Sequence, residues 1–503
     1  MLMEPWKNLK SGTDIRGVAL EGVEGQSVDL TDEIVEKIAS AFAIWLYDKT
    51  EKESLTVAIG RDSRLSGPRI MKILEKTLSA AGIRILLCGL ASTPAMFMTT
   101  VDLKTDAAIQ ITASHHPWNR NGLKFFLPTG GLEGDDIKEI LTLCQEGRFA
   151  PAKAGGSVEE VSYMDTYAER LRAQITEGVG GGDQPLAGFH VTVDAGNGAG
   201  GFYVSKVLQP LGAETSGSEF LEPDGSFPNH IPNPENKEAM GFACRAVKNA
   251  GADLGIIFDT DVDRAGCVDS TGREINRNRL VALASVIALQ GNEGGAVVTD
   301  SITSSGLKTF IEETLGGKHV RFKRGYKNVI NKAIEMNKAG INTPLAIETS
   351  GHAALRENYF LDDGAYLATR ILIEAAKMKK AGKDLVELIE KLEEPAESIE
   401  LRFNITESDF RPVGERILGD LEAFGKEQGW AVADDSFEGV RIAFGGGEGD
   451  GWFLLRLSVH DPVMPLNVES NIPGGCKILA AKLATFLETV SGLDITPLKE
   501  FLA

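Results

Sequence analysis

The residues best suited to chemistry lie in the stretch Thr112–Phe126, which reads TASHHPWNRNGLKFF. Ser114 follows the apolar run Ala107–Ile111 and is flanked by His115 and His116. A serine hydroxyl that the end of a strand presents beside possible bases is a candidate nucleophile. The alternative is a polar turn between two strands, and an isolated Ser-His pair favours that alternative. The rest of the chain decides between the two interpretations.

Three carboxylates alternate directly after another apolar run, Leu254–Phe258. Alternate residues of an extended loop point to one side, so Asp259, Asp261 and Asp263 converge and repel one another. A divalent cation removes this repulsion, and all-oxygen ligands suit Mg²⁺. An EF-hand is excluded because no Glu occupies the twelfth position. A solvated acidic turn is the alternative, but the apolar strand and the following Arg264 favour a metal site near a phosphate.

Two further motifs follow predicted strands and carry groups that bind polar ligands. Glu348–His352, ETSGH, supplies a carboxylate, two hydroxyls and an imidazole. This set suits hydrogen bonding to sugar hydroxyls, although Thr-Ser-Gly is also common turn chemistry. Arg324–Lys327, RGYK, places two cations around a glycine. It fits an anion site and an exposed basic turn equally well.

The C-terminal segment Arg456–Pro462, RLSVHDP, is polar on one side. The period of two in a strand places Arg456, Ser458 and His460 on one face. Arginine, hydroxyl and imidazole together make a phosphate clamp. An edge strand with a solvated face is the alternative, and this segment alone favours it. Loop cations taken singly are expected to be surface charges: Arg16, Arg61, Arg64 and Lys124.

Composition narrows the classes of function. The chain has 503 residues and a formal net charge of -20, which argues against nucleic acid and anionic membranes as partners. The five cysteines form no C-x-x-C pair, as expected of reduced, mostly buried thiols. No apolar run has the length of a bilayer span, and the first residues resemble no targeting signal. We therefore predict a cytoplasmic protein with no membrane partner.

A strand that ends in an aspartate loop recurs along the chain. Apolar runs at Leu55–Ile59, Phe189–Val193 and Ala296–Thr299 each precede such a loop, and a helical segment follows each loop. A second strand and then a strand ending in a polar motif complete each unit. This alternation predicts mostly parallel α/β layers, whose ligands collect at the carboxyl ends of strands. We expect the motifs of the three units to face one another.

The predicted fold class is α/β, with three similar mixed α/β domains and a C-terminal α+β domain around a central active-site cleft. The predicted domains are 1–155 with the serine loop, 156–272 with the metal loop, 273–395 with the sugar loop and 396–503 with the phosphate loop. A helix is predicted over Thr31–Tyr47, with Thr31 or Asp32 as its N-cap. The last domain is expected to contain strands at Ile399–Ile405, Gly439–Phe444 and Phe453–Val459, and helices near Val413–Gln428 and Cys476–Thr489.

Together these segments resemble the α-D-phosphohexomutase family, which includes the phosphoglucomutases and phosphomannomutases, over nearly the whole chain. The family's T-A-S-H-N-P and N-G-x-K are similar to Thr112–Pro117 and Asn121–Lys124, and its D-x-D-x-D-R to Asp259–Arg264. Its G-E-x-S-G-H is similar to Ile347–His352, with Ile347 in place of the first glycine. Supporting matches are Gly12–Gly17, GTDIRG, which is similar to the family's G-T-x-x-x-R-G but one position shorter, and Gly325–Lys327, which is similar to its G-[FY]-K.

The chain departs from the family pattern in two places. His116 stands where the family has an asparagine, beside the candidate nucleophile. The family's phosphate loop reads R-x-S-G-T-E-P, and this chain has Val459, His460 and Asp461 in place of its Gly, Thr and Glu. The second departure affects phosphate contacts and substrate choice, and His460 is expected to supply the lost donor.

The resemblance implies an isomerase of carbohydrate metabolism, an intramolecular phosphotransferase with a phosphoserine. Phospho-Ser114 would convert a hexose monophosphate into hexose 1,6-bisphosphate, and the other phosphate would return to Ser114. Mg²⁺ would be held by Ser114, Asp259, Asp261 and Asp263. The implied catalytic residues are Ser114, Lys124, Arg16, His115, Arg264 and His352. The implied substrate-binding residues are Glu348, Ser350, Lys327, Arg456, Ser458 and His460.

The leading hypothesis is interconversion of the 1- and 6-phosphates of glucose and/or mannose by a monomer or homodimer. Phosphoglucosamine mutase is the nearest alternative, because its sugar loop is similar. A sugar phosphatase would use the same phosphoserine, with water as the acceptor. A non-catalytic sugar-phosphate sensor is disfavoured, because Ser114, Lys124 and the three aspartates are all present.

Overall fold

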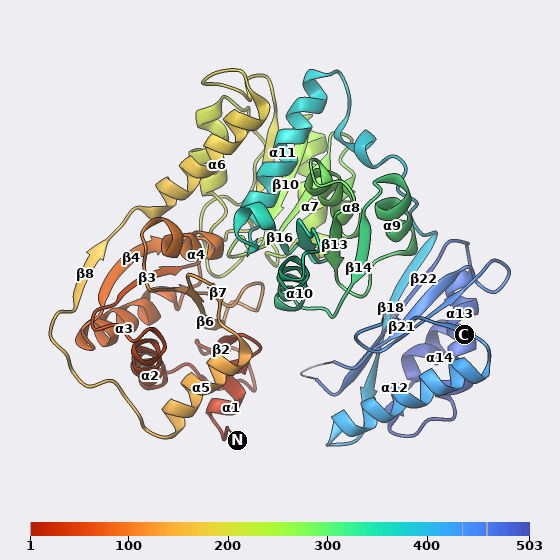
Figure 1. The fold of residues 1–503 in the computed structure, drawn as a ribbon, viewed down its shortest axis with the longest axis horizontal. Coiled ribbons are helices and arrows are strands. Elements are labelled where there is room, and N and C mark those ends of the chain that lie inside the picture. Colours follow the sequence, from red (N-terminus) through yellow and green to blue (C-terminus); the bar gives the residue numbers. More distant parts are fainter. Residues whose placement is uncertain (1, 435, 459–460) are drawn as a thin grey trace. The chain divides into compact units, whose positions relative to one another are not determined.

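The computed structural model describes residues 2–434, 436–458 and 461–503. The chain forms two compact units. Figure 1 labels the helices and strands that make them up. The first contains the chain up to Asn276, together with Ser350–Ala354 and Leu361–Glu387. The second contains Arg277–Thr349, Leu355–Phe360 and the chain from Leu388 onward.

The N-terminal sheet of the first unit has the strand order β1-β2-β6-β5-β3-β4-β8, with β7 beside β6. Strands β5, β3, β4 and β8 run parallel, whereas β6 is antiparallel to β5 and β2. The strands are β1 (Lys10–Ser11), β2 (Asp14–Val18), β3 (Thr56–Arg61), β4 (Arg84–Leu90), β5 (Ala107–Ile111), β6 (Arg120–Leu127), β7 (Gly130–Gly131) and β8 (Ser157–Glu160). Every residue of β5 is buried, as expected for a central parallel strand.

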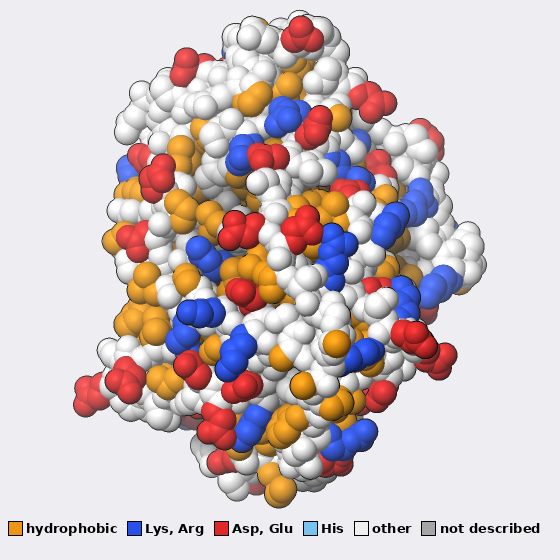
Figure 2. Space-filling model, turned by 90° about the vertical axis from the view of Figure 1, so that its left-hand side faces the viewer, with side chains coloured by type: hydrophobic (Ala, Val, Ile, Leu, Met, Phe, Trp, Pro, Cys, Tyr) orange, Lys and Arg blue, Asp and Glu red, His pale blue; other side chains and the backbone are white. Residues whose placement is uncertain are grey.

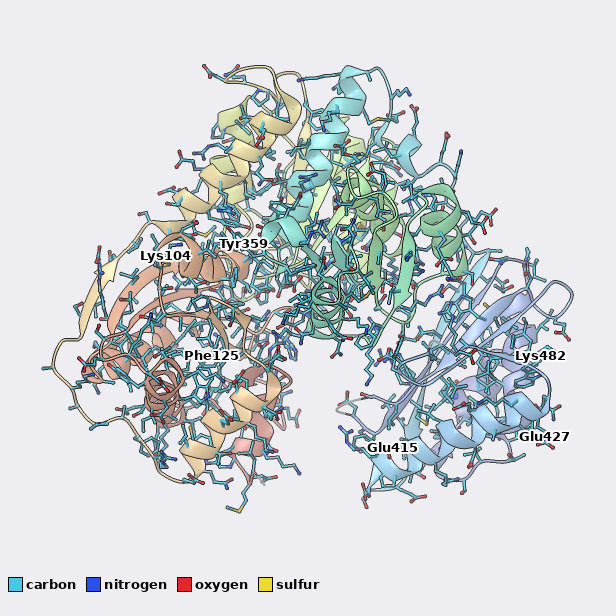
Figure 3. The ribbon with its side chains drawn as sticks, in the orientation of Figure 1. Lys104, Phe125, Tyr359, Glu415, Glu427 and Lys482 are labelled. Carbon is cyan, nitrogen blue, oxygen red and sulfur yellow. The ribbon has the colours of Figure 1, made fainter. Side chains whose placement is uncertain are left out.

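Helices pack on this sheet and close its core. They are α1 (Trp6–Leu9), α2 (Asp32–Thr50), α3 (Gly67–Ala80), α4 (Thr93–Asp102) and α5 (Gly134–Gln145). The Thr31 side chain accepts the N–H of Ile34 and caps α2, so Thr31 is the N-cap. Phe42 of α2 stacks on Phe125 of β6, with ring centroids 4.7 Å apart. Phe125, labelled in Figure 3, therefore points into the core, and Lys124 beside it points to the opposite side of the sheet.

The rest of the first unit is built on a second sheet, with the order β12-β11-β10-β9. Its strands are β9 (Val191–Asp194), β10 (Leu254–Phe258), β11 (Ala265–Asp269) and β12 (Glu274–Ile275). Its helices are α6 (Tyr163–Val179), the π-helix η1 (Tyr203–Leu208), the 3-10 turn η2 (Gln209–Leu211), α7 (Lys237–Ala250) and α11 (Gly364–Lys380). Glu214 and Glu219 make isolated parallel bridges to His190 and Asp194 of this sheet.

In the second unit, β13 (Ala296–Thr299) runs parallel to β14 (Lys318–Arg321) on one side and to β15 (Leu345–Ile347) on the other. The neighbouring helices are α8 (Asn278–Leu289), α9 (Ser305–Thr309), η3 (Phe310–Thr314) and α10 (Tyr326–Lys338). The chain continues through β16 (Ala353–Leu355), most of which belongs to the first unit, η4 (Arg356–Asn358) of the second unit and β17 (Leu361–Asp362) of the first unit. The 3-10 helix η5 (Leu385–Ile389) follows α11. The predicted order of strand, aspartate loop, helix and strand is therefore present around β13.

The C-terminal part of the second unit is an antiparallel sheet with the order β19-β20-β21-β22-β18-β23. Its strands are β18 (Glu397–Ile405), β19 (Ala431–Val432), β20 (Val440–Phe444), β21 (Gly451–Leu455), β22 (Val463–Ser470) and β23 (Leu493–Asp494). Its helices are α12 (Phe410–Glu427), α13 (Gly475–Leu487) and α14 (Thr496–Leu502). Buried apolar side chains of the strands and helices form one core.

One predicted strand of this sheet is wrong at its end. The expected strand continues to residue 459, but β21 ends at Leu455. The N–H groups of Arg456 and Ser458 still donate to Pro465 and Val463, while the Ser458 hydroxyl accepts the N–H of Asp461 and begins a turn. Strand β22, which pairs with β21, was not predicted, because Pro465 has no N–H group to donate and proline is unusual inside a strand.

Two further properties of the structure are the hydropathy of its helices and the charge on one face. Among the residues that the structure describes, no helix is both long and apolar enough to cross a bilayer. Figure 2 shows Lys and Arg side chains interspersed with Asp and Glu over the face that it draws.

Candidate functional site

Strand β5 delivers Ser114 into a buried, polar setting in the first unit. Ser114 is 3% exposed, and its φ of 51° lies in the left-handed region that non-glycine residues rarely adopt. Its N–H donates to the Thr112 hydroxyl at 2.9 Å. Its Oγ lies 3.2 Å from Nδ1 of His115 and 3.5 Å from a carboxylate oxygen of Asp259. Arg264 donates to the same Oγ at 2.9 Å.

The loop after β10 brings the predicted metal ligands together. Asp259, Asp261 and Asp263 are each 0% exposed, and one oxygen from each lies within 4.8 Å of the others. Val262 has a φ of 68°, which is costly for a β-branched residue. The N–H of Gly364, at the start of α11, donates to the Val262 carbonyl at 3.1 Å. Packing of α11 thus holds this strained loop.

The three carboxylates differ in their electrostatic surroundings. Burial and the two neighbouring aspartates raise the pKa of Asp259 well above its ordinary value. Burial and Asp263 also raise the pKa of Asp261. Although burial opposes ionisation of Asp263, the nearby Lys124, His352 and Arg264 hold its pKa below the ordinary range. The cluster therefore carries negative charge in a place where water does not screen it.

A divalent cation fits these residues. The buried oxygens Oδ1 of Asp261 and Oδ1 of Asp263 have no hydrogen-bond partner, and unsatisfied buried carboxylate oxygens are costly. The donor set consists of carboxylate oxygens, as hard cations require. The acidic cluster is thus able to hold a metal ion, as its sequence predicts.

Two predicted cations, Lys124 and Arg16, meet acidic side chains. The ammonium of Lys124 lies 2.8 Å from Asp263, and both side chains are buried. Arg16 of β2 donates to Asp14 at 2.7 Å. A Cβ on Gly122 would stand 2.8 Å from the Arg16 side chain and 2.4 Å from the Ile15 carbonyl. Glycine is therefore required where β6 passes Arg16.

Arg264 and His115 complete the surroundings of the serine. The Arg264 side chain hydrogen-bonds with Nδ1 of His115, and its Nε lies 3.5 Å from Asp259. Burial, with the charge of Arg264 close by, lowers the pKa of His115 to about 2. His115 is therefore a neutral imidazole at physiological pH. Burial and nearby arginines likewise lower the pKa of His116 to about 3, so neither histidine adds positive charge to the serine loop.

His352 lies in the same unit as the serine and metal loops. Its backbone makes an isolated bridge to that of Arg264, and its Nδ1 lies 2.6 Å from Asp362 and 3.8 Å from Asp263. Asp362 also accepts the N–H of Ala353 at 3.1 Å. Asp362 thus fixes the orientation of the His352 ring.

The other predicted sugar-binding residues are divided between the two units. Ser350 belongs to the first unit and is buried, with no hydrogen-bond partner for its Oγ. Glu348 and Lys327 belong to the second unit. There, Glu348 accepts the N–H of Gly325 at 2.6 Å, which joins the ETSGH motif to the RGYK motif.

The predicted phosphate clamp also lies in the second unit. Burial and the nearby Arg324 lower the pKa of Arg456 from its ordinary value, as happens when two cations approach each other. Ser458 lies in the turn that follows β21. His460 lies outside the described residues.

Sequence reasoning misjudged Arg64 and overlooked Thr93 and Asp362. Arg64 was expected at the surface, yet it is 0% exposed. Thr93, at the start of α4, donates its hydroxyl to Asp261, and its N–H donates to the Asp261 carbonyl at 2.8 Å. Asp362 lies ten residues after His352. Arg64 alone had a sequence signal, because it follows Asp62 at the end of an apolar strand.

Comparison with known proteins agrees with this geometry. Three family descriptions match the chain in order: phosphoglucomutase/phosphomannomutase alpha/beta/alpha domain I over residues 8–150, domain II over 165–272 and domain III over 276–395. A phosphoglucomutase of Neisseria gonorrhoeae is 30% identical over 471 residues, which cover 93% of this chain and 95% of the relative. A phosphomannomutase/phosphoglucomutase of Pseudomonas putida is 30% identical over 458 residues, covering 89% and 91%.

A solved structure extends the likeness to the fold. The phosphoglucomutase/phosphomannomutase family protein of Burkholderia thailandensis is 27% identical and has a TM-score of 0.79, covering 96% of this chain and 97% of its own. The predicted fold class, three α/β domains followed by a fourth mixed α/β domain, is confirmed. The chain belongs to the phosphoglucomutase/phosphomannomutase family of phosphohexomutases, whose members are isomerases that transfer a phosphoryl group within their substrate.

Proposed function

We propose that this chain interconverts the 1-phosphate and 6-phosphate of glucose and/or mannose, with Ser114 as the carrier of the phosphoryl group. The observation that carries the proposal is the setting of Ser114 Oγ, which accepts a hydrogen bond from Arg264 and lies 3.5 Å from Asp259. A phosphoryl group on this oxygen would lie between a guanidinium and the acidic loop. The names of the relatives, phosphoglucomutase and phosphomannomutase/phosphoglucomutase, support the same pair of sugars.

The proposed transfer needs no reactant other than the phosphorylated chain and its sugar phosphate. The bond between phosphorus and Ser114 Oγ breaks, a bond forms to the free hydroxyl of the hexose phosphate, and the product is hexose 1,6-bisphosphate. Ser114 Oγ leaves with the bonding electron pair and takes up a proton from Lys124. The proton of the sugar hydroxyl passes to Nε2 of His352, whose Nδ1 is held by Asp362. Return of the other phosphoryl group to Ser114 reverses these steps and releases the isomer.

Cationic side chains of the first unit offset the charge of the transferred group. Such reactions depend on positioning and charge neutralisation more than on covalent assistance. We assign this role to Arg16, Lys124 and Arg264. His115, whose pKa burial lowers to about 2, serves as a neutral neighbour of Ser114 Oγ.

We further propose that the bound metal is Mg²⁺, held by Asp259, Asp261, Asp263 and an oxygen of Ser114. The ion would supply positive charge beside the transferred oxygens when it is bound. The two carboxylate oxygens without hydrogen-bond partners support this assignment.

Substrate recognition is assigned to the sugar and phosphate motifs. Glu348 and Ser350 would bind sugar hydroxyls, and Lys327 would offset charge near the transferred group. Arg456, Ser458 and His460 would hold the phosphate that is not transferred. The buried position of Arg456 near another cation, Arg324, supports an anion as its ligand.

Intact-mass measurement tests the central step. Incubation with hexose 1,6-bisphosphate should add one phosphoryl group to the wild-type chain and none to Ser114→Ala, which should also lose mutase activity. Ser63→Ala is the matched control, because Ser63 is also buried and its Oγ has no hydrogen-bond partner. Full mutase activity in Ser114→Ala would refute the proposal.

A substrate panel separates the proposal from its alternatives. Turnover of glucose 1-phosphate and mannose 1-phosphate is expected, and activity on glucosamine 1-phosphate alone would indicate phosphoglucosamine mutase. Release of free phosphate in excess of isomer would indicate a sugar phosphatase that uses the same phosphoserine.

The remaining proposals concern organisation. We propose domain boundaries at 1–155, 156–272, 273–395 and 396–503, a cytoplasmic location, and a monomer or homodimer with no nucleic-acid or membrane partner. Sedimentation of the purified chain would distinguish monomer from dimer.

A further inference from the structure

The guanidinium of Arg64 binds the backbone of the loop that carries Ser114. One terminal nitrogen donates to the carbonyl oxygens of Pro117 at 2.8 Å and Arg120 at 2.9 Å. The other donates to the carbonyl of Ser114 at 2.5 Å and to that of His116 at 2.6 Å. Arg64 therefore holds the serine loop at several points along its length, from a neighbouring loop of the same unit.

The donor capacity of the two terminal nitrogens of Arg64 is used in full. Its terminal nitrogens carry four hydrogens, which match the carbonyl oxygens just named. The remaining Nε lies 3.3 Å from Asp62, and both side chains are 0% exposed. Asp62 is itself held by the N–H of Arg64 at 2.9 Å. A lysine offers one nitrogen in place of this planar fork, so it would satisfy fewer of these acceptors.

The loop needs such support at Ser114. The φ of 51° places this non-glycine residue in the left-handed region, and such residues persist when the surrounding structure holds them. The Arg64 bond to the Ser114 carbonyl acts directly on the strained residue, and the bond to the His116 carbonyl acts two residues later. The resulting backbone conformation directs Ser114 Oγ toward Arg264 and Asp259.

Segment 223–228 covers Arg64 from the other side. The Phe227 ring centroid lies 5.2 Å from the guanidinium carbon, and a Cβ on Gly225 would stand 2.6 Å from the Arg64 Cα. Full burial beneath the serine loop separates Arg64 from any substrate, and its hydrogen bonds act on the reaction through the loop backbone.

We propose that Arg64 is a positioning residue, which fixes the backbone of Ser114 so that its hydroxyl oxygen is aligned for phosphoryl transfer. This inference rests on the proposed role of Ser114 as the phosphoryl carrier. Arg64 affects the chemical step rather than substrate binding, because the proposed sugar and phosphate contacts are made by other residues.

Arg64→Lys and Arg64→Met test the inference. Both should lower kcat about 100-fold, as a displacement near 1 Å at a reacting group does, while KM changes less than about twofold. The rate at which hexose 1,6-bisphosphate phosphorylates Ser114, followed by intact mass in a quenched time course, should fall by the same factor.

Arg69→Lys is the matched control. Arg69 lies in the same unit and donates to the carbonyls of Ala19 at 3.1 Å and Leu30 at 3.0 Å, rather than to carbonyls of the serine loop. It should change Tm without changing kcat or the phosphorylation rate.

The inference is overturned if either Arg64 variant folds and retains wild-type kcat, or if Arg69→Lys lowers kcat equally for an equal change in Tm. Failure of Arg64→Lys to fold would also overturn it, because Arg64 would then be required for folding rather than for the position of Ser114. The proposed function fails separately, if the wild-type chain accepts no phosphoryl group or Ser114→Ala stays active.

Discussion

A buried aspartate lies at the end of two strands of the first unit, in the same kind of turn. Asp62 directly follows β3, and Asp194 is the last residue of β9. The two aspartates face different cations. Asp62 accepts the N–H of Arg64, and Asp194 accepts that of Gly196, each at 2.9 Å. In both turns the carboxylate binds the backbone two residues further on. Asp62 then lies 3.3 Å from the Arg64 guanidinium, whereas Asp194 lies 3.0 Å from the His230 imidazole.

The two cations behave differently. Arg64 is permanently charged and reaches the serine loop. The His230 ring faces Asp194 through Nε2 and the Ile231 carbonyl through Nδ1, at 2.9 Å. Because both neighbours accept hydrogen bonds, both ring nitrogens must carry protons. Burial opposes this charge, but Asp194 outweighs burial and raises the pKa of His230.

The second unit has a related pairing of an aspartate with a cation after β13. Asp300 is buried, lies 3.6 Å from Arg324 and accepts a hydrogen bond from the Thr349 hydroxyl at 2.7 Å. Each repeat thus pairs the aspartate at the end of its first strand with a cation. Arg64, which is permanently charged, lies beneath the serine loop, whereas His230, which can lose its proton, lies in the second repeat. The same kind of aspartate turn is therefore insensitive to pH beside an arginine and sensitive to pH beside a histidine.

The largest effect is expected at Asp62. Asp62→Asn leaves a fully buried arginine without its counter-charge and should lower the free energy of unfolding by about 3–5 kcal/mol. Asp194→Asn should cost less, because His230 can lose its proton whereas Arg64 cannot. Urea denaturation of both variants measures the difference. Equal losses would contradict the distinction between the two cations.

The metal loop after β10 differs from both turns, because one oxygen from each of three buried aspartates lies within 4.8 Å of the others, and one oxygen of Asp261 has no hydrogen-bond partner. Added Mg²⁺ should therefore stabilise the chain, by about 2.7 kcal/mol at a hundredfold excess over Kd. Thermal unfolding with Mg²⁺ and with EDTA measures this effect. Asp261→Asn should abolish it, and an unchanged Mg²⁺ response in that variant would remove Asp261 from the metal site.

Gly225 provides a third test, because segment 223–228 contacts the turn that carries Arg64 and leads to His230 two residues later. A Cβ at this position would stand 2.4 Å from the Ser63 carbonyl and 2.5 Å from the Leu65 nitrogen. Gly225→Ala should lower the free energy of unfolding by about 1–3 kcal/mol. Gly419→Ala is the control, since nothing lies within 4 Å of its Cβ position in α12, and it should be neutral or stabilising. A neutral Gly225→Ala would show that the two segments separate easily.

The smallest effect is a dependence on pH that only the histidine turn should show. The folded-state pKa of His230 is raised by Asp194, so its stabilising contribution is complete below the unfolded pKa near 6.5 and is lost as pH rises through the folded value. Tm measured from about pH 6 to pH 9 should fall more steeply for wild type than for His230→Gln. Parallel profiles would mean that His230 is neutral.

Much of the fold and site follows from local sequence. Apolar runs predict β5 and β10, and the residues after them are Ser114 and Asp259–Asp263. Thr31 begins α2 because its side chain satisfies a backbone N–H three residues later. These features depend on neighbours in the chain. The end of β21 was not predicted, because the Ser458 hydroxyl binds Asp461 and turns the chain where strand periodicity alone would continue.

The sequence by itself determined which groups were available: a serine at a strand end, alternating carboxylates and cations beside them. Only the tertiary structure decided their partners. Lys124 meets Asp263 across 139 positions of sequence, and Arg64 meets the Ser114 carbonyl across 50. Such pairings depend on how strands of different sheets and the loops between them pack, which no local pattern encodes. Burial then gives them their effect, because a charge excluded from water must find its partner within the protein.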